Sequence, residues 1–85
     1  MQKIIEFQEY VAEEGIKLSW ENGYDIRCLI KDNAVIISAN RQGLISLANH
    51  LVTLAQDLVP VGSHLHFDEY NSLEDGSNEL IISKE

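Results

Sequence analysis

Basic residues are scarce in this chain of 85 residues, which has 6 Lys and Arg against 14 Asp and Glu and a formal net charge of −8. Proteins that bind nucleic acid cover its phosphates with clustered Lys and Arg, whereas the basic residues here are few and scattered. We therefore expect neither nucleic acid nor an anionic membrane as a partner. A negative surface instead attracts basic partners and speeds their encounter.

Cysteine, proline and long apolar runs are also nearly absent. Cys28 is the single cysteine, so no intrachain disulfide can form, and a reducing, cytoplasmic setting is expected. The stretch Met1–Glu6 has no apolar run of the length that a signal peptide or a membrane span needs. We expect one domain covering residues 1–85, neither targeted nor anchored.

Signatures of catalysis are missing as well. The chain has no Gly-x-Ser-x-Gly elbow and no glycine-rich phosphate loop, and Cys28 falls on an apolar face. No nucleophile is accompanied by an acid or base at a recognisable spacing. The sequence therefore predicts a protein that is not an enzyme, with no catalytic residues and no cofactor.

Alternating apolar and polar residues predict strands in the first half of the chain. Residues 3–14 fit both a helical stripe and a short edge strand, so their structure stays open. Three further segments alternate and are separated by the turn-forming pairs Asn-Gly and Asp-Asn. We expect these three to form an antiparallel meander, the last of them near its centre: residues 16–20, 24–30 and 34–39.

Leucine and alanine at three-four spacing predict an amphipathic helix from Arg41 to Leu58, with Asn40 as its N-cap and Pro60 after its end. Strands are expected at residues 64–70 and 79–83, joined by an acidic loop. The predicted fold class is therefore α+β: an antiparallel sheet of about five strands with one main amphipathic helix packed by its leucine face on one side.

Two histidines and a carboxylate share one face of the strand at 64–70. His64, His66 and Asp68 alternate with Leu65 and Phe67, so the three polar side chains point away from the core. A His-x-His pair on a strand can converge on zinc, with Asp68 as a third ligand. A small metal-binding protein is therefore the alternative interpretation, and His50, at the edge of the helix's apolar stripe, is a distant further candidate.

Three segments resemble a known family. They are Ile37–Leu44, the helical run Leu47–Leu51 with Leu54 and Ala55, and Gly62–Glu69 with its Gly-x-His-x-His-x-Asp pattern. Together they are similar to immunity protein family thirty-two of bacterial polymorphic toxin systems. The likeness runs from about Val35 to the end of the chain.

The resemblance implies a small cytoplasmic α+β protein that binds and neutralises a cognate toxin of the same cell, with His50, His64, His66 and Asp68 as family-pattern polar residues. A basic nuclease is one candidate for that toxin, and a homodimer is compatible with this role. Because the last third of the chain is acidic, we place the hypothetical toxin contact on the sheet's open face and rim. The proposed contact residues are His64, His66, Asp68, Glu69, Tyr70, Glu74 and Asp75.

Overall fold

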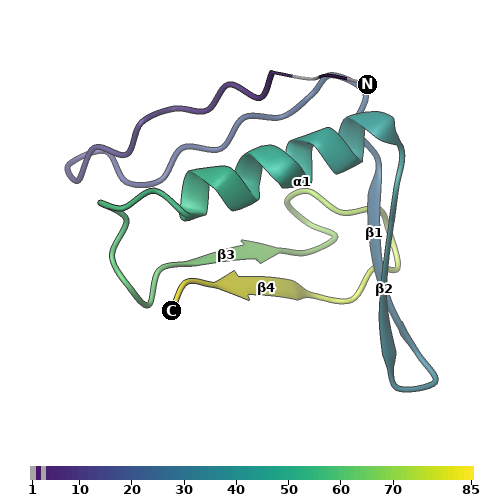
Figure 1. Ribbon diagram of the computed structural model, residues 1–85. Helices are drawn as coiled ribbons and strands as arrows, with labels where there is room; N and C mark the ends of the chain where they lie inside the picture. Colours follow the sequence, from purple (N-terminus) through teal and green to yellow (C-terminus); the bar gives the residue numbers. More distant parts are fainter. Residues whose placement is uncertain (1, 3) are drawn as a thin grey trace.

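A computed structural model describes residue 2 and residues 4–85 of the chain. It is an α+β structure with one helix and two small antiparallel sheets, β1 with β2 and β3 with β4 (Figure 1). The elements are β1 (Ile26–Lys31), β2 (Ala34–Ala39), α1 (Arg41–Leu54), β3 (His64–Phe67) and β4 (Leu80–Ser83). The β3–β4 pair runs beneath α1, and two extended segments, residues 4–10 and 16–21, run along its other side.

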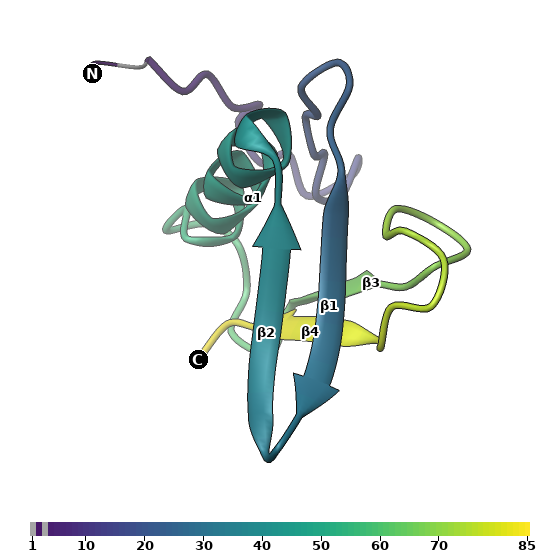
Figure 2. The same ribbon diagram turned by 90° about the vertical axis from the view of Figure 1, so that its right-hand side faces the viewer.

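The β1–β2 hairpin turns through Asp32 and Asn33, whose φ angles are 51° and 65°. Two consecutive positive φ angles are those of a type I′ turn, which matches the twist of the flanking strands. The strands pair from Lys31 opposite Ala34 to Ile26 opposite Ala39. Figure 2 shows that the hairpin extends well beyond the rest of the molecule.

The two edges of this hairpin differ. Beside β1, the backbone N–H of Glu74 donates to Ile26 O at 3.0 Å, and that of Asn78 donates to Cys28 O at 2.6 Å. Beside β2, no strand of the described residues pairs with the outer edge. The expected central position of residues 34–39 is therefore wrong: β2 is an edge strand.

Helix α1 begins where the sequence predicts, because Asn40 caps it. The Asn40 side-chain oxygen accepts hydrogen bonds from Gly43 N at 2.8 Å and Asp25 N at 3.0 Å, while its amide donates to Gly23 O. The helix ends at Leu54, four residues before the predicted Leu58. The apolar spacing continues past the end of the helix, but Leu58 itself is 78% exposed.

The buried face of α1 is mostly polar, with Leu54 as its buried leucine, which the leucine pattern did not predict. Ser46, Asn49, His50 and Thr53 are each at most 6% exposed, whereas Leu44 and Leu51 are 55% and 50% exposed. The expectation that the leucine face covers a sheet is therefore wrong for the exposed leucines.

The two extended segments account for this polar face. They form no strands, and the side chains of α1 take over part of their backbone hydrogen bonding. Glu21 N donates to Ser46 Oγ at 2.8 Å, Ser19 N donates to Asn49 Oδ1 at 3.4 Å, and Asn49 Nδ2 donates to Glu6 O. The predicted strand at 16–20 is consequently an extended segment held by a helix.

The expectation of a single sheet of about five strands is therefore wrong. The described residues contain four strands in two separate two-stranded sheets. Residues 4–14 are neither a helix nor a strand, apart from a bridge between Val11 and Gly15, and residue 3 lies outside the described residues. The predicted strand at 64–70 stops at Phe67, because Asp68 opens a turn.

One hydrophobic core joins the helix to both sheets. Each of its members is at most 5% exposed, and each sheet contributes two of them. Each large apolar side chain buried in this core contributes roughly 1.5–3 kcal/mol to the free energy of folding, so the core is the main source of stability. The core residues are Ile26, Cys28, Leu54, Val59, Leu65, Phe67 and Leu73.

Candidate functional site

Strand β3 presents two histidines on its outer face. Leu65 and Phe67 are 5% and 3% exposed and belong to the core, while His64 and His66 alternate with them and are exposed. His66 lies opposite Ile81 in the register with β4. The alternation predicted from the sequence is confirmed at these four positions.

Asp68 organises the turn that follows β3. Its Oδ1 accepts hydrogen bonds from Tyr70 N at 2.9 Å and Asn71 N at 3.1 Å, the arrangement of an Asx turn. Asn71 closes the turn, because its Oδ1 accepts from Asp68 N and its amide donates to His66 O. The Asp68 carboxylate is therefore engaged in holding the backbone, and Tyr70 beside it is 90% exposed.

The segment from residue 68 to residue 79 is fastened along the outer edge of β1. Leu73 is 5% exposed in the core, and Ile30 N donates to Asn78 Oδ1 at 3.2 Å on the far side of the segment. Between these points, Glu69 Oε2 accepts from Gly76 N at 2.8 Å, where the backbone has a φ of 85°. This acidic segment is thus held at both ends and in its middle.

Negative charge gathers on this acidic segment. It holds five carboxylate residues and no Lys or Arg. Glu74, Asp75 and Glu79 are exposed, and Asp68 and Glu69 are half-buried. In the view of Figure 2 the segment lies to the right of the hairpin and α1 lies to its left. Of the proposed contact residues, all seven therefore fall on β3 or on this segment.

His66 is the histidine closest to carboxylates. Its Nε2 lies 3.2 Å from Glu79 Oε2 and 3.6 Å from Asp68 Oδ2, and all three side chains are 30–56% exposed. Exposed side-chain contacts of this kind contribute little to stability. Across the described residues, no group of three or more His, Cys, Asp and Glu side chains could hold a metal ion. The metal-binding alternative, with His64, His66 and Asp68 as ligands, therefore has no support in the described structure.

His50 lies in the core and not at the boundary where the sequence placed it. Its side chain is 0% exposed, and its ring centroid lies 4.2 Å from that of Trp20 and 5.4 Å from that of Phe67. Burial lowers the pKa of His50 below 6.5, and the hydrogen bond to Ser19 O opposes this shift. His50 is accordingly a structural residue and cannot touch a partner in the folded protein.

The neutral ring of His50 has one defined tautomer. Its Nε2 lies 3.0 Å from Ser19 O, which only accepts, so Nε2 carries the proton. The other nitrogen, Nδ1, is buried and has no hydrogen-bond partner among the described residues. Protonation of Nδ1 would place an unpaired charge in the core.

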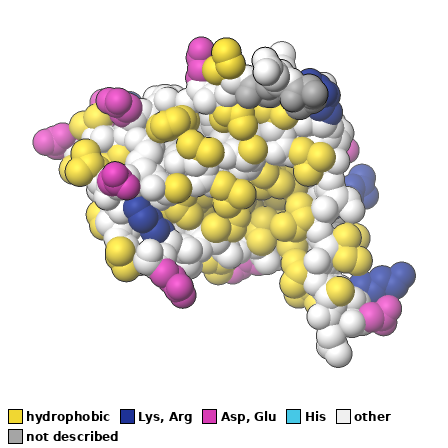
Figure 3. Space-filling view, viewed as in Figure 1, with side chains coloured by type: hydrophobic (Ala, Val, Ile, Leu, Met, Phe, Trp, Pro, Cys, Tyr) yellow, Lys and Arg dark blue, Asp and Glu magenta, His cyan; other side chains and the backbone are white. Residues whose placement is uncertain are grey.

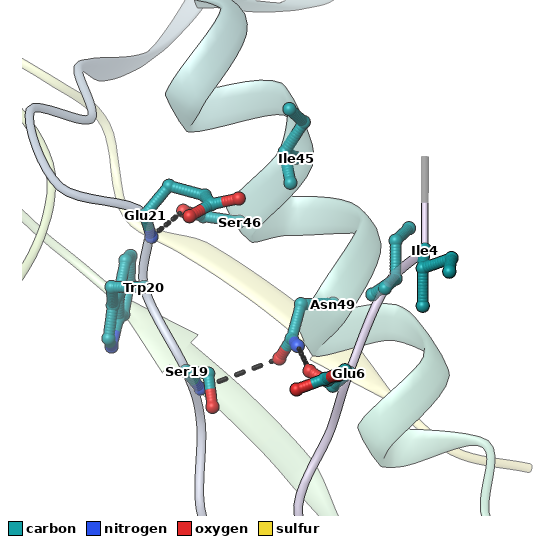
Figure 4. A pocket seen from close by; sticks show the side chains of 9 residues that line it. Ile4, Glu6, Ser19, Trp20, Glu21, Ile45, Ser46 and Asn49 are labelled. Carbon is teal, nitrogen blue, oxygen red and sulfur yellow. Dashed lines mark hydrogen bonds between the residues drawn. The ribbon is translucent and has the colours of Figure 1, made fainter. Parts of the chain in front are cut away.

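A cavity of about 320 Å³ lies between the first extended segment, the second one and α1 (Figure 4). Trp20, Ile45 and Ile4 contribute its apolar walls. Ser46 and Asn49 lie on its polar side, and both use their side chains to hold the extended segments, as the dashed lines in Figure 4 mark. The Ser46 and Asn49 side chains thus serve the fold, because they bind backbone groups of the two extended segments.

The described residues contain no helix that is long and apolar enough to span a membrane. No curated protein and no solved structure matches the chain significantly. A family model does match: immunity protein 32, over residues 34–85. The matched part includes β2, α1, β3, the acidic segment and β4, and it contains all seven residues proposed as contacts. The chain therefore belongs to the immunity protein 32 family.

Proposed function

We propose that this protein binds and neutralises a cognate bacterial toxin in the cytoplasm, as a stoichiometric inhibitor and not as an enzyme. Membership of the immunity protein 32 family supports the class of partner. The proposed mechanism is electrostatic and steric cover of the toxin's active region. A basic nuclease is the toxin class that an acidic surface fits best, because such an enzyme presents Lys and Arg to phosphates.

The acidic segment is the observation that carries the proposed contact surface. Five carboxylates in a segment that itself has no Lys or Arg favour a negative local potential, which raises the rate of encounter with a basic protein. The hydrogen bonds to β1 hold the segment in place before binding, so little ordering entropy is lost on association. Tyr70, 90% exposed at the start of this segment, offers the large aromatic contact typical of binding hot spots.

The contact residues have different roles in this proposal. Glu74 and Asp75 are exposed and supply charge to the partner. Asp68 and Glu69 use carboxylate oxygens to hold the turn, so they position the segment as well as charging it. His64 and His66 form the neighbouring edge of the surface on β3.

The immunity function is tested by growth of cells that express the product of the neighbouring toxin gene, alone and together with this protein. We expect toxicity that only co-expression relieves, and co-elution of the two proteins. A harmless neighbour would contradict the proposal, and so would toxicity that persists beside folded protein.

The contact surface is tested by a double charge reversal, Glu74→Lys with Asp75→Lys, chosen because neither side chain is needed for the Asx turn. A matched control, Glu9→Lys with Glu13→Lys, makes the same change in net charge at exposed positions elsewhere. We expect the first variant to lose at least about tenfold in toxin affinity, and the control to change it far less. Equal losses in both variants would show that only net charge matters and would reject this surface.

A further inference from the structure

We propose that the open edge of β2 pairs with the β2 edge of a second copy of this chain, giving a two-fold symmetric dimer with a continuous four-stranded sheet. This surface is separate from the acidic segment and needs no toxin. The proposal rests on three properties of the β1–β2 hairpin: the direction of its free backbone groups, the exposure of its apolar face and its local charge.

The backbone groups of Val35 and Ile37 face the open edge. Antiparallel strands alternate between residue pairs that exchange hydrogen bonds and pairs that do not. Cys28 turns both its N–H and its carbonyl away from β2, toward Ser77 and Asn78, and Ile30 turns its N–H the same way. Their partners in the register, Ile37 and Val35, must therefore point their own backbone groups outward, where no described residue accepts or donates.

The apolar face of the hairpin continues past the end of the core. Ile26 and Cys28 are 1% exposed and face α1, where a Cβ built on Gly43 would meet Ile26 Cγ1 at 2.9 Å. On the same face, toward the hairpin tip, Ile30 is 61% exposed and Val35 is 63% exposed. A two-stranded ribbon that exposes such side chains is marginally stable by itself, and added strands cover them.

Figure 3 shows the face of the molecule on which this edge lies. Hydrophobic side chains gather across its middle, Lys, Arg, Asp and Glu lie toward its margins, and no histidine is visible on it. Leu44 and Leu51 of α1 and Val35 and Ile37 of β2 are 43–63% exposed. Together they leave on the order of several hundred Å² of apolar surface, which exceeds scattered exposure. The paired strand backbones and their neighbours would have to supply the rest of the roughly 800 Å² per partner of a standard interface.

Charge disfavours a basic toxin as the occupant of this edge. Residues 26–41 hold Arg27, Lys31 and Arg41 against Asp32, a local charge of +3 − 1 = +2, while the whole chain carries −8. A basic partner would be repelled here, and in the symmetric dimer this weakly basic edge meets its own copy, so charge itself adds no attraction between the two copies. In addition, α1, β2 and β4 contain no acidic residue, so two copies meet there without facing carboxylates.

The edge is also self-complementary. In an antiparallel pairing centred on Ile36, Val35 of each copy lies opposite Ile37 of the other, and each of these pairs exchanges both N–H···O bonds. The same register sets Asn33, at the hairpin tip, opposite the partner's Ala39, next to the start of α1. Because the two-fold axis is perpendicular to the sheet, the same face of both hairpins lies on one side of the four-stranded sheet. The exposed Ile30 and Val35 at the tip of one copy then lie on the same side as the exposed Leu44 of the other.

The test is the mass of the purified chain, alone, by sedimentation velocity over a range of concentrations. We expect the wild type to reach twice the chain mass. Val35→Pro removes an outward N–H without breaking a hydrogen bond of its own hairpin, and should raise the dimer dissociation constant at least about tenfold. Val35→Thr keeps the N–H and should stay dimeric.

A second pair of variants covers the case in which Val35→Pro does not fold. Leu44→Gln should weaken the dimer, whereas Val61→Gln, at a position 76% exposed in the turn after the helix, should not. Circular dichroism checks that each variant is folded. A wild-type chain that stays monomeric at every concentration overturns the proposal, and so does a dimer that Val35→Pro and Leu44→Gln leave unchanged. A monomer whose toxin binding is lost in Val35→Pro would assign the edge to the toxin and refute pairing with a second copy.

Discussion

Gly43 offers the sharpest test of how α1 is seated on the hairpin. A glycine in a helix normally costs about 1 kcal/mol relative to alanine, so Gly43→Ala would be stabilising if space allowed it. Here a Cβ would lie 2.5 Å from the backbone oxygen of Asp25, 2.9 Å from Ile26 Cγ1 and 3.0 Å from Ala39 Cβ. The Asp25 carbonyl also accepts from Asn40 N at 3.1 Å, so it cannot move without loosening the start of the helix.

Overpacking of a close contact costs about 1–3 kcal/mol, and a backbone obstacle places Gly43→Ala toward the upper end of that range. After the gain in helix propensity we expect a net loss of about 1–2 kcal/mol in the free energy of unfolding. Urea denaturation at constant pH measures it, and the difference between Gln42→Ala and Gln42→Gly measures the propensity contribution at an exposed neighbouring position. A Gly43→Ala protein as stable as the wild type would refute the close seating of the helix.

Three other predictions concern residues that the fold uses. Because burial lowers the pKa of His50, the unfolded chain binds more protons below pH 6.5; stability should be full above that pH and fall as the pH drops toward the folded pKa. Urea midpoints between about pH 8 and pH 5 should show this component in the wild type and lose it in His50→Gln, which keeps a donor for Ser19. Asn40→Ala should cost about 2 kcal/mol in a thermal melt, and Asn40→Ser clearly less. The Tyr10 N–H donates a hydrogen bond to Gln56 Oε1 at 2.8 Å. Gln56→Ala should therefore speed hydrogen exchange at the Tyr10 amide, with little change in global stability.

Local signals in the sequence located the β1–β2 hairpin and the start of the helix. The strand at 34–39 has the predicted bounds, and α1 begins at Arg41 as expected. Both are set by chemistry within a few residues: the Asp32-Asn33 pair tolerates positive φ, and Asn40 satisfies the first free N–H groups of the helix.

Leucine spacing alone predicts the wrong buried face for α1, because the helix also carries a polar stripe. Ser46, Asn49, Thr53 and Gln56 recur at steps of three, four and three, which is also one helical face. This polar stripe is the signal that could have revealed that α1 holds backbone segments lacking strand partners. The alternation at residues 16–20 also resembles that of a strand. An extended segment buries every second side chain whether its backbone hydrogen bonds are made by a neighbouring strand or by side chains of a helix.

The sequence predicted those features of the candidate site that depend on β3 alone, and none that depend on how β3 packs against other segments. The alternation of His64 and His66 with core residues is a property of β3 alone. The approach of His66 to Glu79 depends on the β3–β4 register, and the fastening of the acidic segment depends on contacts with β1, more than 40 residues earlier in the chain. Long-range contacts of this kind produce no pattern of spacing in the local sequence from which they could be predicted.

Charge and apolar surface are separated in this small protein, and the separation bears on both proposals. The acidic segment covers the β1 edge of the hairpin, whereas no described strand pairs with the β2 edge. A toxin on the acidic segment and a second copy on β2 would then bind on different sides of the same two strands (Figure 2). If the hairpin transmits no change between its edges, the two equilibria are independent, and toxin affinity does not depend on protein concentration through dimerisation. If they are coupled, reciprocity requires that dimerisation alters toxin affinity by the same factor by which toxin alters dimerisation. The Val35→Pro protein distinguishes these cases, because it changes one edge and leaves every residue of the acidic segment in place.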